Sequence, residues 1–128
     1  MILLDTCTLL WLAADQGRLS RAAVQAIGDA GDSVDVSAIS AWEICWKQAK
    51  GHLDLKMEAG AWFDLAIEVH RVRIRPITSG IAVRAAGLPR IHDDPADRFI
   101  IATAQEHGLA ILTPDQNIHR YPDLKVVW

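Results

Sequence analysis

The sequence predicts an α/β fold, in which helices cover both faces of a mostly parallel sheet as a three-layer α/β/α sandwich. Short apolar runs alternate along the chain with longer stretches in which apolar residues recur at helical spacing. The short runs are apolar throughout, which is typical of strands that are buried on both faces. A length of 128 residues, without an internal repeat or a linker, predicts that residues 1–128 form a single domain.

Strands and helices are expected to alternate through the first half of the chain. The expected elements are a strand at Met1–Asp5, a helix with apolar residues Leu9, Leu10 and Ala13, a helix that follows Ser20 and ends at Gly28 and Gly31, a strand at Val34–Val36, and a helix from Ser37 or Ser40 to Lys50.

The second half continues the alternation, and its clearest helix start is Asp94-Pro95, an N-cap residue followed by proline at the first helical position. The expected elements are a helix at Met57–Val69, a strand with one polar face at Arg71–Ile77, a helix from Thr78 to Gly87, a helix from Asp94 to His107, and strands at Leu109–Leu112 and Lys125–Trp128.

Composition and charge restrict the possible classes of protein. A hydrophobic fraction of 51% and a charged fraction of 23% indicate a folded globular chain. A net charge of −3 argues against a protein that holds nucleic acid by a broad positive surface, although an enzyme that meets phosphates through bound cations needs no such surface. The apolar start is interrupted by Asp5, so we expect neither a signal peptide nor a membrane span. Cys7 and Cys45 show no CxxC pairing, so we expect reduced core cysteines and a cytoplasmic location.

Acidic residues follow several of the predicted strands, and each has an ordinary structural explanation. Asp5 could cap the first helix. Glu43 could complete a capping box with Ser40. Asp97 could be an acid favoured by the helix dipole, with Asp94 as the cap. The fourth acid, Asp115, follows Pro114 and could occupy an ordinary turn.

Taken together, the positions of these acids favour a metal site. In a parallel sheet, the loops and helix starts that follow the strands meet at one edge. Crowded carboxylates repel one another and need a cation to remain ionised. Carboxylate oxygens suit Mg²⁺ or Mn²⁺, which bind through few protein ligands together with a substrate phosphate. The sequence therefore predicts a site for metal-assisted chemistry on a phosphate.

Nearly the full chain resembles the PIN domain, and specifically the VapC-type toxins of bacterial type II toxin–antitoxin pairs. The resemblance is carried, in this order and spacing, by LLDTCTLLW, VSAISAWEICWKQAKGHLDL, LPRIHDDPADRFIIATA and GLAILTPDQNIHRYPDLKVVW. It implies that Asp5, Glu43 and Asp97 are the acids of the family's metal site, with Asp115 at a fourth position that varies among relatives. Asp97 is chosen because it immediately precedes RFIIATA, and Asp93 and Asp94 remain ambiguous neighbours.

The expected activity is endoribonucleolytic cleavage of RNA by a water activated on Mg²⁺, without a covalent enzyme intermediate. Asp5 and Asp97 are the expected direct ligands, and Glu43 and Asp115 act through water or position the nucleophile. The resemblance also implies a homodimer and an antitoxin whose C-terminal segment covers the acidic pocket. One alternative is a PIN fold that binds RNA or protein without catalysis, which retention of the four acids disfavours. A phosphatase with an aspartate nucleophile is disfavoured because Cys7 replaces its usual second acid.

Other polar and aromatic residues are expected to have structural roles. Arg98 could bind phosphate, but an arginine there is more often solvated or ion-paired. The remaining residues considered are threonines that cap helices or orient a carboxylate (Thr6, Thr8, Thr113), histidines without zinc-site spacing that we treat as non-ligands (His92, His107, His119), and tryptophans expected in the core or an interface (Trp42, Trp46, Trp62).

Overall fold

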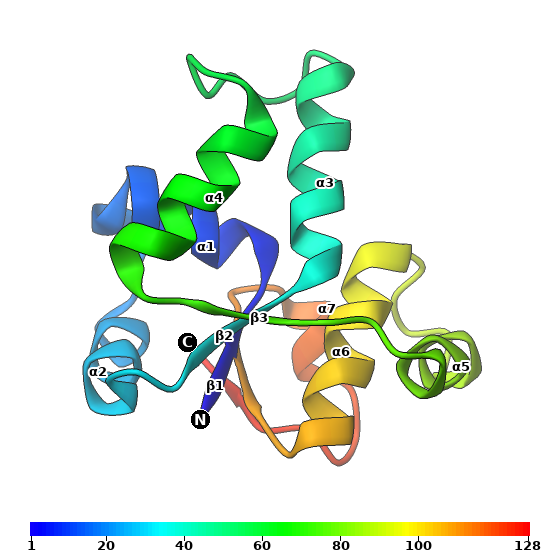
Figure 1. Ribbon diagram of the computed structural model, residues 1–128. Coiled ribbons are helices and arrows are strands. Elements are labelled where there is room, and N and C mark those ends of the chain that lie inside the picture. Colours follow the sequence, from blue (N-terminus) through cyan, green and yellow to red (C-terminus); the bar gives the residue numbers. More distant parts are fainter.

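A five-stranded sheet forms the centre of the computed structural model, which describes residues 1–128 (Figure 1). All neighbouring strands are parallel, and their spatial order is β3-β2-β1-β4-β5. The strands are β1 (Ile2–Leu4), β2 (Val34–Ser37), β3 (Arg73–Arg75), β4 (Ala110–Leu112) and β5 (Val126–Val127). The chain builds outward from β1 to β3 and then returns to β4, so the direction of winding reverses between β1 and β4. Ligands of open α/β sheets bind beyond the carboxyl ends of the strands at such a reversal.

Helices cover both faces of this sheet, as the sequence predicts (Figure 1). They are α1 (Thr6–Ala14), α2 (Arg21–Ala30), α3 (Ala38–Ala49), α4 (Ala59–His70), α5 (Ser79–Gly87), α6 (Pro95–His107) and α7 (Gln116–His119), with a 3₁₀ turn at Gln16–Arg18. α1, α2 and α4 lie on one side, and α5, α6 and α7 lie on the other. α3 and α4 pack together and extend beyond the carboxyl ends of the strands. None of these helices is long and apolar enough to span a membrane.

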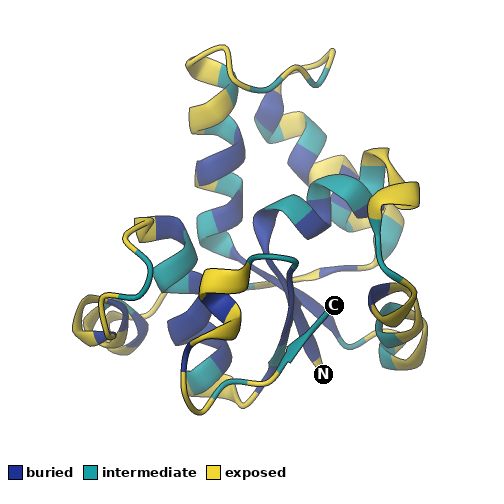
Figure 2. Ribbon diagram, turned by 180° about the vertical axis from the view of Figure 1, so that it is seen from behind, coloured by how far each residue is buried: buried dark blue, intermediate teal, exposed yellow.

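Two apolar clusters, one on each face of the sheet, form the core. Leu4 in β1 packs into the cluster beneath α1, α2 and α4, whereas its neighbour Leu3 packs into the cluster beneath α5 and α6. This division follows from the strand geometry, because successive side chains point to opposite faces. Figure 2 shows the strands buried at the centre and exposed residues along the outer helices. The buried β1 therefore fixes the position of the residue that follows it, Asp5.

Several helix boundaries differ from the sequence prediction. Gly28 lies inside α2, which ends only before Gly31, where a φ of 58° suits glycine. α3 begins after Ser37, the first of the two starts that the sequence allows. The Ser37 side chain accepts from the Ile39 amide, and Ser40 lies within the helix. α7 is absent from the predicted elements, where the structural alternative for Asp115 is an ordinary turn. Instead, Asp115 caps this four-residue helix and accepts a hydrogen bond from the Asn117 amide.

The prediction that the strands are apolar throughout is wrong at β2, which contains the fully buried Asp35. Its Oδ1 accepts from Arg73 Nε at 2.8 Å and its Oδ2 accepts from Arg75 Nε at 2.7 Å. Both arginines lie on β3, at the edge of the sheet, and their side chains are 51% and 26% exposed. A buried carboxylate is costly unless charged partners compensate it. The alternating pattern of β3 therefore supplies the cations that this acid requires.

We expect the double substitution Arg73→Met, Arg75→Met to lower the free energy of unfolding by about 3–5 kcal/mol, because it leaves Asp35 buried and unpaired. The matched control is Arg71→Met. Arg71 is exposed and lies 3.9 Å from the exposed Asp32, so its loss should change stability by less than about 0.5 kcal/mol. Urea denaturation at neutral pH measures both values. Equal stability of the two variants would contradict the assigned role of Asp35.

Candidate metal centre

Asp5 lies immediately after β1, at the reversal of the sheet, and it caps α1. Its Oδ1 accepts from the Thr8 amide at 2.9 Å, which confirms the capping role. Its Oδ2 accepts a hydrogen bond from the Thr113 hydroxyl, beyond the end of β4. Burial raises the pKa of Asp5 in spite of these bonds. Asp5 is therefore a helix cap whose carboxylate is also held at the meeting point of β1 and β4.

Glu43 is buried on the second turn of α3, with only 7% of its surface exposed. The capping box with Ser40 does not form, because Ser37 is the N-cap and the Ser40 hydroxyl instead bonds the Thr6 hydroxyl at 2.9 Å. One Glu43 oxygen, Oε2, lies 3.2 Å from Lys47 Nζ. The other, Oε1, is buried without a hydrogen-bond partner. An orphaned buried acceptor of this kind needs a further ligand or a function to account for it.

Asp97 and Asp115 approach each other through His92. His92 Nε2 lies 2.8 Å from Asp97 Oδ2 and 2.9 Å from Asp115 Oδ2. These three ligand atoms all lie within 4.8 Å of one another. From the sequence, His92 is expected to be a non-ligand because no zinc-type spacing includes it, and its position between two of the acids is not predicted. The sequence signal that we overlooked is its place in HDDPAD, where a short loop before a helix brings it back against Asp97.

Threonine hydroxyls connect the acids to the backbone. The Thr113 hydroxyl donates to Asp5 and accepts from the Asp115 amide at 3.0 Å, so it links two of the candidate acids. The Thr8 hydroxyl donates to the Leu112 carbonyl at 2.9 Å and ties α1 to the end of β4. Of the alternatives that we considered for these residues, orientation of a carboxylate describes Thr113. Thr8 instead holds α1 against the end of β4.

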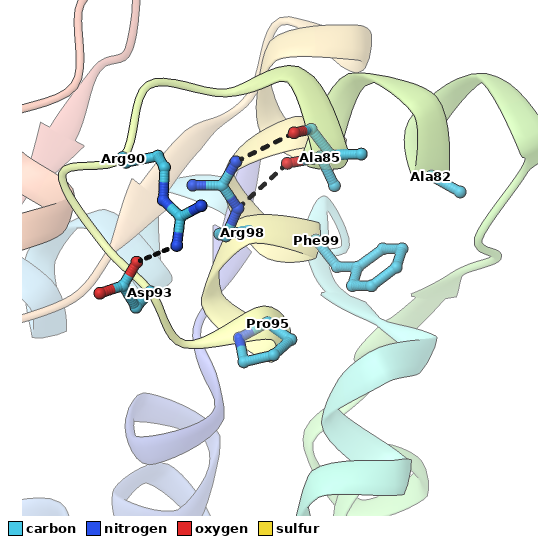
Figure 3. Close-up of a pocket in the computed structure, with 8 residues that line it drawn as sticks. Ala82, Ala85, Arg90, Asp93, Pro95, Arg98 and Phe99 are labelled. Atoms are coloured by element: carbon cyan, nitrogen blue, oxygen red, sulfur yellow. Dashed lines mark hydrogen bonds and ion pairs between the residues drawn. The ribbon is translucent and has the colours of Figure 1, made fainter.

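Asp93 and Asp94, the ambiguous neighbours, have different roles from Asp97. Asp94 is the N-cap of α6 and accepts from the Asp97 amide at 3.1 Å, as its sequence position predicts. Asp93 is exposed and lies 3.4 Å from Arg90. Its side chain pairs with Arg90 at the rim of a cavity of about 350 Å³ between α5 and α6 (Figure 3). None of the four candidate acids lines this cavity.

Arg98 is neither a phosphate ligand nor an ion-paired surface residue. Its guanidinium reaches back to the carboxyl end of α5 and the loop that follows (Figure 3). It donates to the carbonyl oxygens of Ala85, Ala86, Leu88, Pro89 and His92. The last carbonyls of a helix lack partners within the helix, and a nearby arginine can satisfy them. Arg98 therefore fixes the loop that carries His92.

The electrostatics of the cluster centre on Asp97, whose pKa is raised to about 7. Burial is the main cause, followed by the negative charges of Asp94 and Glu43, and Asp5 contributes further. Burial also lowers the pKa of His92, but the hydrogen bond to Asp115 and the surrounding negative charge outweigh it and leave that pKa raised. The acids therefore lie within electrostatic reach of one another in a partly dehydrated site, and proximity makes their simultaneous ionisation costly.

This set of residues fits a hard divalent cation. Carboxylate oxygens are the ligands that Mg²⁺ and Mn²⁺ prefer, and a bound cation would offset the repulsion between the acids. The unpartnered Oε1 of Glu43 supplies an acceptor that the protein itself leaves unsatisfied. Asp97 and Asp115 lie together around His92, and Asp5 and Glu43 lie within electrostatic reach of Asp97. A cation among these acids would be held directly or through water.

The tryptophans divide between the core and the surface. Trp42 and Trp46 lie outside the core, since they are 52% and 48% exposed and stack on each other along α3 at 5.7 Å between ring centroids, so an interface is the expected environment that remains for them. Trp62, in contrast, packs against the core. Both cysteines are only partly buried. Cys45 packs against the core, but the Cys7 thiol donates to Asp5 Oδ1 at 3.3 Å, and burial together with the charge of Asp5 raises its pKa.

We expect Asp97→Asn to stabilise the protein at pH 8 by about 2–4 kcal/mol in the presence of chelator, and to have little effect near pH 4. The pKa of Asp97 is higher in the folded than in the unfolded chain, so the folded state binds an extra proton between about pH 4 and pH 7 and loses stability as the pH rises through this range. Urea denaturation at both pH values measures the effect. Asp93→Asn, at an exposed neighbour, is the control and should change stability by less than about 0.5 kcal/mol. A loss of stability for Asp97→Asn at pH 8 would contradict the electrostatic account.

Comparison with known proteins agrees with this fold. The family model of the PIN domain matches residues 2–124. Ribonuclease VapC22 of Mycobacterium tuberculosis is 39% identical over 130 aligned residues, which cover 99% of this chain and 98% of that protein. A toxin–antitoxin complex from Klebsiella pneumoniae contains a chain of similar structure, with a TM-score of 0.68, 25% identity and coverage of 100% of this chain and 97% of that one. VapBC2 from Rickettsia felis, solved with a promoter DNA fragment, has a TM-score of 0.73 at 15% identity, with coverage of 98% and 97%, and shares the fold. The chain belongs to the PIN-domain family and, within it, to the VapC group.

Proposed function

We propose that this protein is a Mg²⁺-dependent endoribonuclease that acts as the toxin of a toxin–antitoxin pair. The observation that carries the proposal is the buried, unpartnered Glu43 Oε1, set beside carboxylates that the fold crowds together at the reversal of the sheet. Asp5 and Asp115 also cap helices, but the crowding of Asp5, Glu43 and Asp97 in a partly dehydrated site is costly without a cation. Membership of the VapC group and 39% identity to a protein named a ribonuclease support RNA as the substrate.

The four acids have different surroundings and therefore different proposed roles. Asp5 and Asp97 are the proposed direct ligands. Glu43 and Asp115 hold the ion or the attacking water through solvent, and Mn²⁺ is an alternative to Mg²⁺. When bound, a divalent cation lowers the pKa of a coordinated water and offsets negative charge on phosphate oxygens. Thr113 keeps Asp5 oriented for this task through its hydroxyl.

The net charge of the protein is consistent with RNA binding through a metal cation and not through a positive protein surface. The net charge is −3, and Arg98, the arginine beside Asp97, is occupied by backbone carbonyls. A broad electrostatic hold on the phosphate backbone is therefore not expected. The proposed protein meets the scissile phosphate through its cation, and Arg73, Arg75 and Arg98 are occupied by structural contacts.

We further propose a homodimer that acts in the cytoplasm and is controlled by a small antitoxin over the acidic pocket. The similar chain from Klebsiella pneumoniae comes from a toxin–antitoxin complex. A guanidinium or ammonium group from the antitoxin could pair with the carboxylates in place of the metal. Trp46 is exposed and available as an apolar anchor, whereas Trp62 is packed against the core and is not.

Purified protein incubated with total RNA is expected to cut it in the presence of Mg²⁺ and to leave it intact with chelator, with defined ends when the products are mapped. Asp97→Asn should lower cleavage at least about 100-fold, because it removes a proposed ligand. Asp93→Asn is the matched control and should cut at the wild-type rate. Cleavage that persists in chelator would contradict metal dependence. RNA binding without cleavage by folded wild-type protein would favour a catalytically inactive binding module.

A further inference from the structure

His92 is held at several points by the surrounding residues. Its amide donates to the Tyr121 hydroxyl at 2.9 Å, and its carbonyl accepts from Arg98 Nη1 at 3.1 Å. Its ring atom Nδ1 accepts from the Asp94 amide at 3.2 Å. Tyr121 in turn donates to the Pro89 carbonyl at 2.9 Å and so fixes the same loop from a second direction. The backbone and the ring of His92 are therefore both oriented by the surrounding fold.

These contacts determine which ring nitrogen carries a hydrogen. Nδ1 accepts from a backbone N–H, so the tautomer with its only hydrogen on Nδ1 would place two donors against each other. While Nδ1 accepts this bond, the one ring hydrogen lies on Nε2. Nε2 faces Asp115 Oδ2 and Asp97 Oδ2 at 2.9 and 2.8 Å. It is a hydrogen-bond donor to the acids, and without a lone pair it cannot ligate a metal.

We propose that His92 is a positioning residue that closes the space between Asp97 and Asp115 to a divalent cation, so that this pair of acids shares an N–H in place of a second metal ion. This inference deepens the proposed function, on which it rests for the role of the acids. Asp97 remains available to a cation on the side of Asp5 and Glu43, whose charges it senses. Asp115 is restrained by the imidazole and reaches that cation only through solvent.

The ring occupies the space that a shared cation would need. The two carboxylate oxygens lie within 4.8 Å of each other. Mg²⁺ binds oxygen at about 2.0–2.1 Å, so an ion bridging two oxygens can accept a separation of up to about 4.2 Å. A small adjustment would therefore make Asp97 and Asp115 a bridging pair once the donor is removed. Repulsion between the two uncompensated acids would then favour uptake of an ion.

The test counts Mn²⁺ ions by electron paramagnetic resonance at saturation, for the wild type, His92→Leu and His92→Gln. His92→Leu removes the donor, whereas the Gln amide can place an N–H close to the position of Nε2. We expect the Leu variant to bind about one more Mn²⁺ ion per chain than the wild type, and the Gln variant to match the wild type. Equal counts in the wild type and the Leu variant would overturn the proposal. An extra ion in both variants would also overturn it, because the donor would then be irrelevant.

The inference and the proposed function can fail separately in this experiment. The difference between the Leu variant and the wild type tests His92, whereas the number of ions in the wild type itself tests metal dependence. A wild type that binds none, with an ion appearing in the Leu variant, would support the role of His92 and contradict the proposed function. Nitrogen-15 NMR of the wild-type imidazole gives an independent result if the Leu variant does not fold. A hydrogen on Nε2 is expected, and a neutral ring with its hydrogen on Nδ1 would overturn the proposal.

Discussion

The Asp5 carboxylate connects the start of α1 to the residue that follows β4. It caps α1 through the Thr8 amide, and it accepts from Thr113 beyond the end of the neighbouring strand. The bond from Thr113 exists because β1 and β4 are parallel neighbours in register, with Leu4 opposite Leu112. The buried strands therefore place a charged group where water is largely excluded. The remaining acids are arranged around this fixed point by α3, α6 and α7.

The fold holds these acids against a substantial electrostatic cost. Burial and neighbouring charges raise the pKa of Asp97 to about 7, and Glu43 keeps one oxygen without a partner. Elsewhere, the protein compensates its buried acid fully, since Asp35 is paired with two arginines on β3. The contrast between these two buried sites is informative. Asp35 is fully paired by two arginines, whereas the acids at the sheet reversal are compensated only in part, by Lys47 and His92.

Much of this arrangement could be predicted from the sequence, because it depends on local signals. The sandwich fold, the Asp94-Pro95 start of α6 and the Ser20 and Thr78 caps follow from periodicity and capping chemistry. The role of His92 was missed, although its place just before Asp97 in HDDPAD is a local signal. The roles of Arg98 and Asp35 could not be predicted, because they depend on contacts between residues distant in the chain or on the path of an irregular loop. The Glu43 capping box failed for a related reason, since two serines were equally good caps and only tertiary packing selected Ser37.

Titration calorimetry with Mn²⁺ tests the central claim, that crowded carboxylates at the sheet reversal require a cation. At about pH 6, Asp97 is largely protonated, so binding should release protons and the observed heat should change with the ionisation enthalpy of the buffer. Asp5→Asn, Asp97→Asn should remain folded and lose measurable binding. Binding of Mn²⁺ to this double variant as tightly as to the wild type would contradict the account.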